Sequence, residues 1–173
     1  MIETNALVCT KLSEDMSFVR IETLMLSDPK DHEVLIKVKA ASVNFPDLLM
    51  TKGMYQHKPE LPFVLGMEGS GVVKKIGKKV TKIKEGDEVT FGAMGKGAFS
   101  EYVVVGESSV ETKPSNLNFS EAASFQTAYL TAYVSLVRRG KLLKGENLLV
   151  HGSTGGVGMA AVQLGRYLGA NVI

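Results

Sequence analysis

Short runs of hydrophobic residues with a period of two fill the chain from its start to about residue 115. The clearest run is 34–40, in which the even-numbered positions are apolar, while Lys37 and Lys39 share the other face. Similar alternating or β-branched runs cover residues 6–10, 18–22, 71–76, 88–91 and 99–105. Nine of the 18 glycines lie between positions 66 and 106 and separate several of these runs. Many short strands joined by turns predict a small, irregular β-barrel or sandwich.

The pattern changes near residue 118, where helical signals replace the alternation. Ser120 is a good N-cap and Glu121 stands in a first turn, where the helix dipole favours an anion. Two arginines at 138–139 and the stop signal Gly140 mark the other end. One helix of nearly twenty residues is therefore predicted.

A strand, a glycine cluster and a second helix follow the turn signal at Gly145. Residues 148–151 form a short apolar run, and the apolar positions 157, 161, 164 and 168 then share one helical face that ends at Gly169. Residues 171–173 look like the opening of another strand. We therefore expect two domains, residues 1–118 and residues 119–173, the second comprising a linking helix and a strand–helix unit that stops inside its second strand.

The composition is that of a folded protein without a strong electric field. Hydrophobic residues make up 45% of the chain and charged residues 22%, and the net charge is +2. This balance argues against nucleic acid or an anionic membrane as the main partner. Cys9 is the only cysteine, which excludes an intrachain disulfide and an all-cysteine zinc site. The N-terminal residues lack the pattern of a secretion signal, so a cytoplasmic protein is expected.

Six lysines between positions 74 and 84 form the one conspicuous charge run. They alternate with apolar residues across a glycine turn, at positions 74, 75, 78, 79, 82 and 84. A polyanion could bind such a run, but a solvated hairpin face is the better interpretation.

The strongest local sign of a binding site is a glycine-rich motif, which follows the predicted strand at 148–151 and begins the next helix. It reads STGGVG, with Ser153 at the position of a first glycine and Gly155, Gly156, Val157 and Gly158 after it. Such glycines let the backbone approach a pyrophosphate, and the helix N-terminus offers unbonded N–H groups. The pattern predicts a dinucleotide phosphate site; the alternative is a tight turn without a ligand.

Four motifs occur in an order that resembles one protein family. They are NFPD at 44–47, GMEGSGVV at 66–73, GAFSEY at 97–102 and the late glycine turn. In this order they resemble the zinc-free, zeta-crystallin-like quinone oxidoreductases of the medium-chain dehydrogenase/reductase superfamily, over the whole chain. The resemblance implies an α+β part followed by an α/β part: a GroES-like β-barrel catalytic domain, then the truncated start of a Rossmann domain, with the active site in the cleft between them.

Two positions set the chain apart from the zinc-dependent branch that it resembles. Asn44 stands where those alcohol dehydrogenases have a cysteine ligand, and Met67 where they have a histidine. A catalytic zinc needs three protein ligands, and His32, His57 and His151 have no ligand spacing. The resemblance therefore implies a zinc-independent enzyme. Without a Lewis acid, hydride addition to a conjugated quinone or enone is easier than interconversion of an alcohol and a ketone.

The resemblance also carries over site residues. It implies that Asn44, Asp47 and Tyr55 are catalytic residues of the substrate cleft, with Asn44 and Tyr55 donating hydrogen bonds to a carbonyl. Thr131 is implied to contact the cofactor together with the glycine turn. The alternatives are that Asn44 and Asp47 cap a turn before a helix at 48–52, that Tyr55 packs on a wall, and that Thr131 bonds back along its helix. Leu49 stands where some members have a tyrosine.

The implied activity is NADPH-dependent reduction of a quinone or an α,β-unsaturated carbonyl by an oxidoreductase that forms a homodimer at full length. Two alternatives stay open: an enoyl or acyl-CoA-type reductase of the same superfamily, and a non-catalytic fragment without a complete cofactor site. NADPH rather than NAD follows from the resemblance alone, because the residues that read the ribose lie about 20 positions beyond the glycine turn. We therefore expect the 173-residue chain alone to bind NADPH weakly and to turn over poorly.

Overall fold

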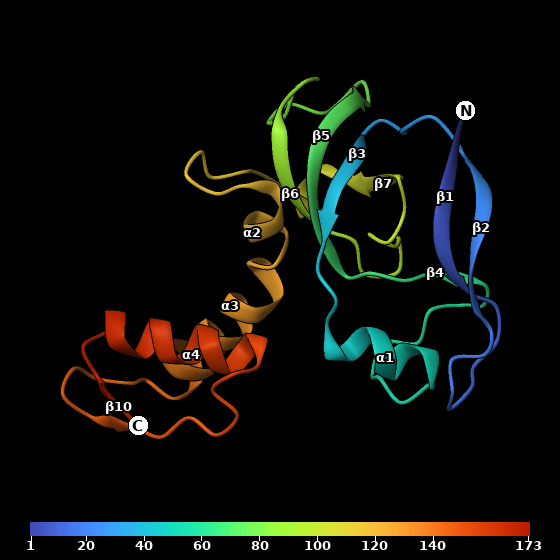
Figure 1. The fold of residues 1–173 in the computed structure, drawn as a ribbon. Coiled ribbons are helices and arrows are strands. Elements are labelled where there is room, and N and C mark those ends of the chain that lie inside the picture. The colour runs from blue at the N-terminus through green and yellow to red at the C-terminus, as the bar shows by residue number, and fades with distance from the viewer. The chain divides into compact units, whose positions relative to one another are not determined.

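The computed structural model describes all 173 residues, which divide into two compact units, Met1–Ser124 and Phe125–Ile173 (Figure 1). The division falls after Ser124 rather than after residue 118, because helix α2 (Phe119–Ala123) packs on strands of the first unit. The hydroxyl of Ser70 donates a 2.6 Å hydrogen bond to the carbonyl oxygen of Phe119 and fastens the start of this helix.

The first unit consists mainly of strands, which form two antiparallel sheets. Their bounds are β1 Ile2–Cys9, β2 Val19–Leu26, β3 Glu33–Ala41, β4 Phe63–Val64, β5 Glu68–Ile76, β6 Glu88–Gly92, β7 Tyr102–Gly106 and β8 Val110–Thr112. The orders are β2-β1-β4 and β7-β3-β5-β6-β8. Helix α1 (Phe45–Thr51), a 3₁₀ turn η1 (Glu107–Ser109) and α2 complete the unit. All six predicted strand runs are confirmed, and only the short β4 and β8 lie outside them.

Backbone hydrogen bonds tie the two sheets together near the end of β1. The N–H of Leu7 donates to the carbonyl of Phe99 at 2.8 Å, and the N–H of Leu65 donates to the carbonyl of Leu7 at 3.0 Å. A bridge between Ala6 and Ser100 continues the contact. The N–H of Val38 in β3 donates to the carbonyl of Glu101 at 2.9 Å, so the segment 99–101, which lies outside the named strands, links the two sheets.

The alternation predicted for residues 34–40 is confirmed with one difference. Val34 and Ile36 are completely buried in the larger core cluster, together with residues of β5, β6, β7 and β8. Leu35, on the opposite face, is also buried. The start of β3 is therefore covered on both faces, whereas its later residues Lys37 and Lys39 are half-buried and exposed.

The single helix predicted from Ser120 to Arg139 is wrong. Helix α2 begins at Phe119, because Asn118 rather than Ser120 is its N-cap: Asn118 Oδ1 accepts from Glu121 N, and Glu121 Oε2 accepts from Asn118 N, each at 2.9 Å. This reciprocal pair is a capping box, which satisfies two unbonded donors at once. The helix ends at Ala123, and helix α3 starts at Gln126.

The second unit contains α3 (Gln126–Tyr133), a π-helical continuation η2 (Val134–Arg139), β9 (Asn147–Leu148), α4 (Gly156–Tyr167) and β10 (Asn171–Val172). Strands β9 and β10 pair in parallel, which is the strand–helix–strand order that the sequence predicts. Helices α3 and α4 pack through small side chains of Ala128, Ala132 and Ala160. None of the helices combines the length and the apolar character that crossing a membrane requires.

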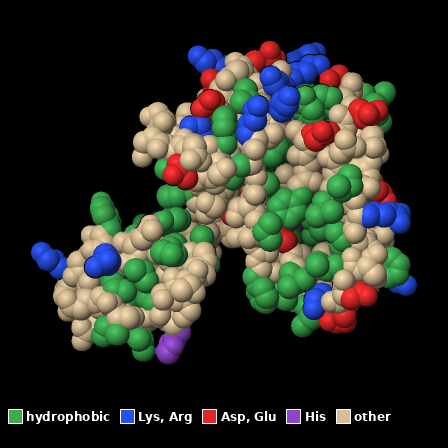
Figure 2. All heavy atoms as spheres, in the orientation of Figure 1, with side chains coloured by type: hydrophobic (Ala, Val, Ile, Leu, Met, Phe, Trp, Pro, Cys, Tyr) green, Lys and Arg blue, Asp and Glu red, His purple; other side chains and the backbone are tan.

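The lysine run between positions 74 and 84 faces solvent, as the sequence predicts. All six lysines are exposed, and Figure 2 shows basic side chains gathered over the ends of β5 and β6 with acidic ones between them. Lys75 Nζ lies 2.8 Å from Asp28 Oδ1, and Lys79 Nζ lies 2.9 Å from Asp31 Oδ2. Neighbouring carboxylates therefore offset part of this positive charge.

Candidate functional site

The first group of candidate residues lies at the N-terminus of α1. Strand β3 ends at Ala41, and Asn44, with extended backbone, is the N-cap of a helix that begins at Phe45 and carries Pro46 in its first turn. The alternative helix start at residue 48 is therefore three residues too late. Asp47 stands at the third helical position, where a carboxylate can reach back to the cap.

Asp47 holds this region together by accepting two backbone hydrogen bonds. Its Oδ2 accepts from Asn44 N at 2.8 Å, and its Oδ1 accepts from Gly66 N at 3.2 Å. Its side chain is only 4% exposed. Asp47 thus clamps the start of α1 to the turn before β5, and this arrangement is the capping role that the sequence offered as an alternative.

The environment of Asp47 disfavours its charged form. Burial raises the pKa of this carboxyl above its ordinary value, and the negative charge of Glu68 acts in the same direction. The two backbone N–H donors, from Asn44 and Gly66, partly oppose the rise because they stabilise the carboxylate.

Gly66 is required for this arrangement. Its φ of +100° is one that side chains rarely adopt, and a Cβ would lie 2.6 Å from the backbone nitrogen of Phe99. The carbonyl of Gly66 accepts from Ala98 N at 3.0 Å. The backbone of residues 98–99 therefore lies directly against Gly66, whose N–H donates to Asp47.

Asn44 makes its shortest side-chain hydrogen bond to Glu68, the first residue of β5. Asn44 Nδ2 donates to Glu68 Oε1 at 2.8 Å and makes longer contacts of 3.4 Å with the carbonyl and hydroxyl oxygens of Ser42. Glu68 is 2% exposed. Glu68 is not among the site residues predicted from the sequence, although it is the only charged residue between positions 61 and 73, a signal that could have singled it out.

Met67 and Tyr55 belong to an apolar cluster beside this polar group. Met67 is buried with Cys9, Met50, Phe63 and Leu65, and Tyr55 packs half-buried against them. Packing alone holds the ring of Tyr55. Its hydroxyl makes no hydrogen bond within the chain and is available to a ligand.

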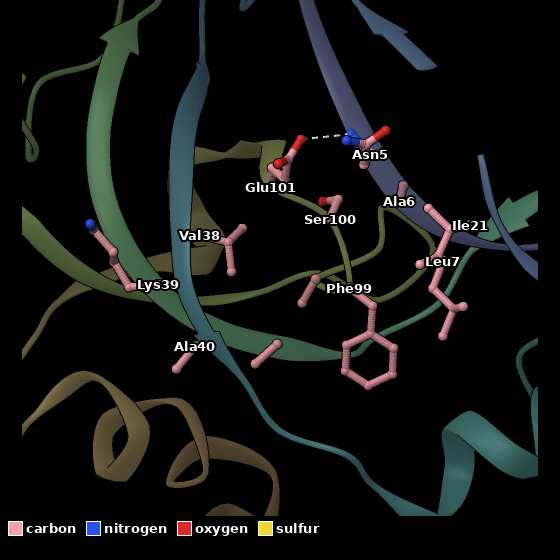
Figure 3. A pocket seen from close by; sticks show the side chains of 12 residues that line it. Asn5, Ala6, Leu7, Ile21, Val38, Lys39, Ala40, Phe99, Ser100 and Glu101 are labelled. Carbon is pink, nitrogen blue, oxygen red and sulfur yellow. Dashed lines mark hydrogen bonds between the residues drawn. The ribbon is translucent and has the colours of Figure 1, made fainter. Parts of the chain in front are cut away.

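A groove of about 510 Å³ adjoins the same cluster (Figure 3). Its lining is mostly apolar and comes from β1, β2, the end of β3 and residues 98–101. Leu7 and Phe99 line the groove and also pack on the cluster that holds Tyr55. At one end the carboxylate of Glu101 accepts from the backbone N–H of Asn5 at 2.9 Å. None of the predicted site residues lines this groove.

No group of three or more histidine, cysteine, aspartate or glutamate side chains is placed to hold a metal ion. His32, His57 and His151 are all exposed, and Cys9 is buried with its thiol bonded to the carbonyl of Lys11. Burial raises the pKa of the Cys9 thiol.

The second group of candidates is the glycine turn between β9 and α4. Gly152 has φ +70°, and its carbonyl accepts from Gly155 N at 3.1 Å, after which α4 starts at Gly156. The N–H groups of Gly156, Val157 and Gly158 have no acceptor in the chain, as expected for a first helical turn. Ser153, Gly155, Gly156 and Val157 are exposed and Gly158 is half-buried, so these donors can be reached from solvent.

Thr131 lies on α3 of the second unit and is exposed. Its hydroxyl forms no hydrogen bond within the chain, and instead Ser135 Oγ donates to the Thr131 carbonyl at 2.8 Å. The structure thus brings Asn44 and Asp47 together with Glu68 in the first unit, and places Thr131 and the glycine turn in the second.

Comparison with known proteins identifies the domain that most of the first unit forms. Residues 30–115 match the family model of the alcohol dehydrogenase GroES-like domain. The quinone oxidoreductase of Homo sapiens is 37% identical over 145 residues, which cover 84% of this chain and 44% of that protein. The chain therefore spans about half the length of the curated relatives it matches.

Solved structures show the same fold over nearly the whole chain. A probable oxidoreductase from Mycobacterium abscessus is 37% identical with a TM-score of 0.90, over 99% of this chain and 54% of that one. A mycobacterial protein solved in complex with NADPH is 32% identical with a TM-score of 0.87, over 98% and 52%. The CurK enoyl reductase is 27% identical with a TM-score of 0.85, over 98% and 53%.

The GroES-like fold that the resemblance implied is confirmed by the matched domain and by these structures. The relatives named quinone oxidoreductase include proteins from human, pig and mouse at 35% identity or more. The chain therefore belongs to the quinone oxidoreductase group of the medium-chain dehydrogenase/reductase superfamily.

Proposed function

We propose that the protein containing this chain is an NADPH-dependent quinone oxidoreductase, which transfers hydride to a quinone or an α,β-unsaturated carbonyl without zinc. Support for the reaction class comes from the names of its relatives. In this proposal the first unit is the catalytic domain, and the second unit, from the linking helix onward, is the start of the dinucleotide-binding domain.

The observation that carries the proposal is the geometry of the glycine turn. A Cβ on Gly158 would lie 2.1 Å from the carbonyl oxygen of Gly152, so helix and turn approach each other as only glycine allows. The resulting surface presents the unbonded N–H groups of Gly156, Val157 and Gly158 at the positive end of the α4 dipole. These groups fit a pyrophosphate. When bound, the nicotinamide dinucleotide supplies the hydride.

The preference for NADPH is supported by a relative rather than by residues of this chain. The mycobacterial structure with NADPH shows that a protein of this fold binds that cofactor. We propose that Thr131 and Ser153 contribute hydroxyl groups to the same cofactor, because both are exposed and belong to the unit that carries the turn.

The zinc-independent character is supported by what surrounds Glu68. Asn44 and Met67 stand at the two positions where the zinc-dependent branch has ligands, and Asn44 bonds Glu68 directly while Met67 is buried in an apolar cluster. An amide nitrogen and a thioether in apolar surroundings are poor partners for zinc, which prefers thiolate, imidazole and carboxylate. Elemental analysis that found stoichiometric zinc would contradict this part of the proposal.

We assign substrate-binding roles to the two residues whose side-chain hydrogen-bond donors are available to a ligand. Asn44 has a second N–H that makes only long contacts, and the hydroxyl of Tyr55 is uncommitted, so we propose that these two groups donate to the acceptor carbonyl. Donors aimed at an oxygen that gains negative charge stabilise the transition state. Asp47 fixes the backbone of Asn44 and does not itself touch the substrate.

The test combines cofactor titration and turnover. NADPH and NADH are titrated by fluorescence against the 173-residue chain and against the longer protein, and oxidation of NADPH is then followed with p-benzoquinone and with a simple enone. We expect tight binding and turnover by the longer protein and weak binding by the chain alone. A longer protein that binds no NADPH, or that reduces neither acceptor, would contradict the proposal.

The alternative is an enoyl reductase, favoured by the similarity to the CurK structure. Both reactions deliver hydride to a conjugated acceptor, so acceptor preference distinguishes them. Faster turnover of an enoyl thioester than of p-benzoquinone, at equal concentrations, would favour the enoyl reductase.

A further inference from the structure

Glu68 is a buried carboxylate to which the proposed reaction gives no role. It is 2% exposed and is the first residue of β5, in a stretch where every other residue from 61 to 73 is uncharged. Moving a carboxylate out of water is unfavourable unless hydrogen bonds compensate it. A glutamate at this place therefore needs partners, and one of them is the candidate substrate residue Asn44.

The bond between them settles how the Asn44 amide is turned. A carboxylate oxygen can only accept a hydrogen bond, so the group that lies 2.8 Å from Glu68 Oε1 must be the nitrogen of the amide and not its oxygen. A second link, from Ser42 N to the Glu68 carbonyl at 3.4 Å, holds the preceding loop to the same residue. Glu68 thus fixes both the amide and the backbone that carries it.

The two N–H groups of the Asn44 amide therefore differ in how strongly they are hydrogen-bonded. One is held by the short, charge-assisted bond to Glu68, and the other has only the 3.4 Å contacts with the two oxygens of Ser42. The side chain of Asn44 is half-exposed, whereas that of Glu68 is not. A carbonyl oxygen that arrives from solvent can therefore take the second N–H without displacing the first.

We propose that Glu68 is a positioning residue, which orients the Asn44 amide so that its second N–H meets the carbonyl oxygen of the acceptor. This inference rests on the proposed quinone reduction and extends it by one residue. Glu68 acts only through Asn44, and it touches neither the acceptor nor the cofactor.

The decisive experiment is a double-mutant cycle in the full-length protein. Glu68→Gln keeps the size of the side chain and removes its charge, and Asn44→Ala removes the amide. We expect Glu68→Gln to lower kcat/KM for p-benzoquinone about tenfold, since positioning errors weaken a transition-state contact, and to leave the NADPH dissociation constant unchanged. In the Asn44→Ala background the same change has no further effect.

The matched control is Glu107→Gln. Glu107 also accepts backbone hydrogen bonds, from Thr81 and Lys82, but it lies on the surface outside the candidate site. We expect its kcat/KM to equal that of the unmodified protein. Thermal unfolding of every variant separates a loss of folded protein from a loss of activity.

A second readout needs no turnover. In the ¹⁵N spectrum of the 173-residue chain, the Asn44 side-chain amide is identified by its absence in Asn44→Ala. We expect one of its two protons to exchange slowly and to shift when Glu68 becomes Gln. An amide whose two protons exchange alike, and that Glu68→Gln leaves unmoved, overturns the proposed orientation.

The outcomes separate the inference from the function on which it rests. An unmodified protein that reduces no acceptor contradicts the proposed function. A protein that turns over, but in which Glu68→Gln is fully active, contradicts the positioning role. Equal losses from Glu68→Gln with and without Asn44 show that Glu68 acts independently of the amide, and they too overturn it.

Discussion

Gly158 lies directly against Gly152: a Cβ on Gly158 would lie 2.1 Å from the Gly152 carbonyl oxygen and 2.9 Å from the Cα of Ser153. Gly155 has no such restriction, because its Cβ would meet the same oxygen at 3.6 Å, an ordinary contact. Two glycines of one motif therefore differ in what they do. One permits a close approach of backbone, and the other is replaceable on steric grounds.

Gly158→Ala is expected to weaken NADPH binding at least tenfold, because the turn has to open to admit the methyl group. It should also destabilise the chain by about 2 kcal/mol or more, although alanine is the better helix former by about 1 kcal/mol. Gly155→Ala is the matched control, and we expect its affinity to stay within about twofold. Fluorescence titration and urea unfolding measure both effects, and equal affinities for the two variants would contradict the steric interpretation.

Gly66→Ala is expected to destabilise the first unit by several kcal/mol, because the unfavourable φ of +100° is combined with a backbone contact of 2.6 Å. Gly86→Ala provides the control: its φ is +90°, but nothing lies within 4 Å of the added carbon. We expect only the strain of the backbone there, about 1 kcal/mol. Urea unfolding followed by circular dichroism compares the two, and similar losses would show that the contact does not matter.

Asp47→Asn tests the pKa shift of the buried carboxyl. Since burial raises the pKa of Asp47 in the folded state, the folded protein takes up a proton at higher pH than the unfolded chain. The unmodified protein should therefore gain stability relative to Asp47→Asn as the pH falls from 7 towards 4. At pH 7 the variant should be destabilised by about 1–3 kcal/mol, because an amide nitrogen then faces a backbone donor. A difference in unfolding free energy that shrinks on acidification would contradict this sign.

Glu107 is expected to show the opposite dependence on pH. Backbone N–H groups of Lys82 and Thr81 lower the pKa of the carboxyl of this half-buried residue. Its stabilising effect is present above the ordinary glutamate value of about 4.3 and is lost as the pH falls through the lower folded value. The difference in melting temperature between the unmodified protein and Glu107→Gln should therefore shrink between pH 6 and about pH 3.

Glu111→Gln serves as the control for Glu107. Glu111 is exposed on β8, and its side chain forms no hydrogen bond within the chain. We expect its difference from the unmodified protein to stay constant over the same pH range. A parallel trend in both variants would show that general charge, and not the two N–H donors, is responsible.

The strands could be predicted because their signal is local. Alternation over residues 34–40 depends on which side chains face the core, and the burial of Val34 and Ile36 follows it. Strands β4 and β8 have two and three residues, too few for any period to show. They exist because partners elsewhere in the chain, β1 and β6, supply their hydrogen bonds.

The break between α2 and α3 could not be predicted from helix signals alone. No glycine or proline lies between residues 119 and 139, and the interruption follows Ser124, whose N–H and hydroxyl both bond the carbonyl of Glu121. The start of α2 at Phe119, in contrast, can be predicted from the sequence. Asn118 and Glu121 have the spacing of a capping box, and this pair is a stronger signal than Ser120 alone.

The same division between local and distant signals applies to the candidate site. The glycine turn lies within seven consecutive residues, so its backbone geometry could be inferred from the motif. The bond from Asn44 to Glu68 joins residues 24 positions apart, and only the pairing of β3 with β5 brings them together. A sequence pattern cannot show which polar residues the pairing of two distant strands brings into contact.

The clamp that Asp47 makes with Gly66 has a consequence for the order of folding. It closes a loop across 19 positions, and it forms only when the segment between α1 and β5 has returned to the helix. The turn from Gly152 to Gly158 closes over a few residues, and local closure is the faster event. We therefore expect the glycine turn to form early and the contact between α1 and the turn before β5 to form late. Slow steps in refolding should delay recovery of the Asn44 environment more than that of the glycine turn.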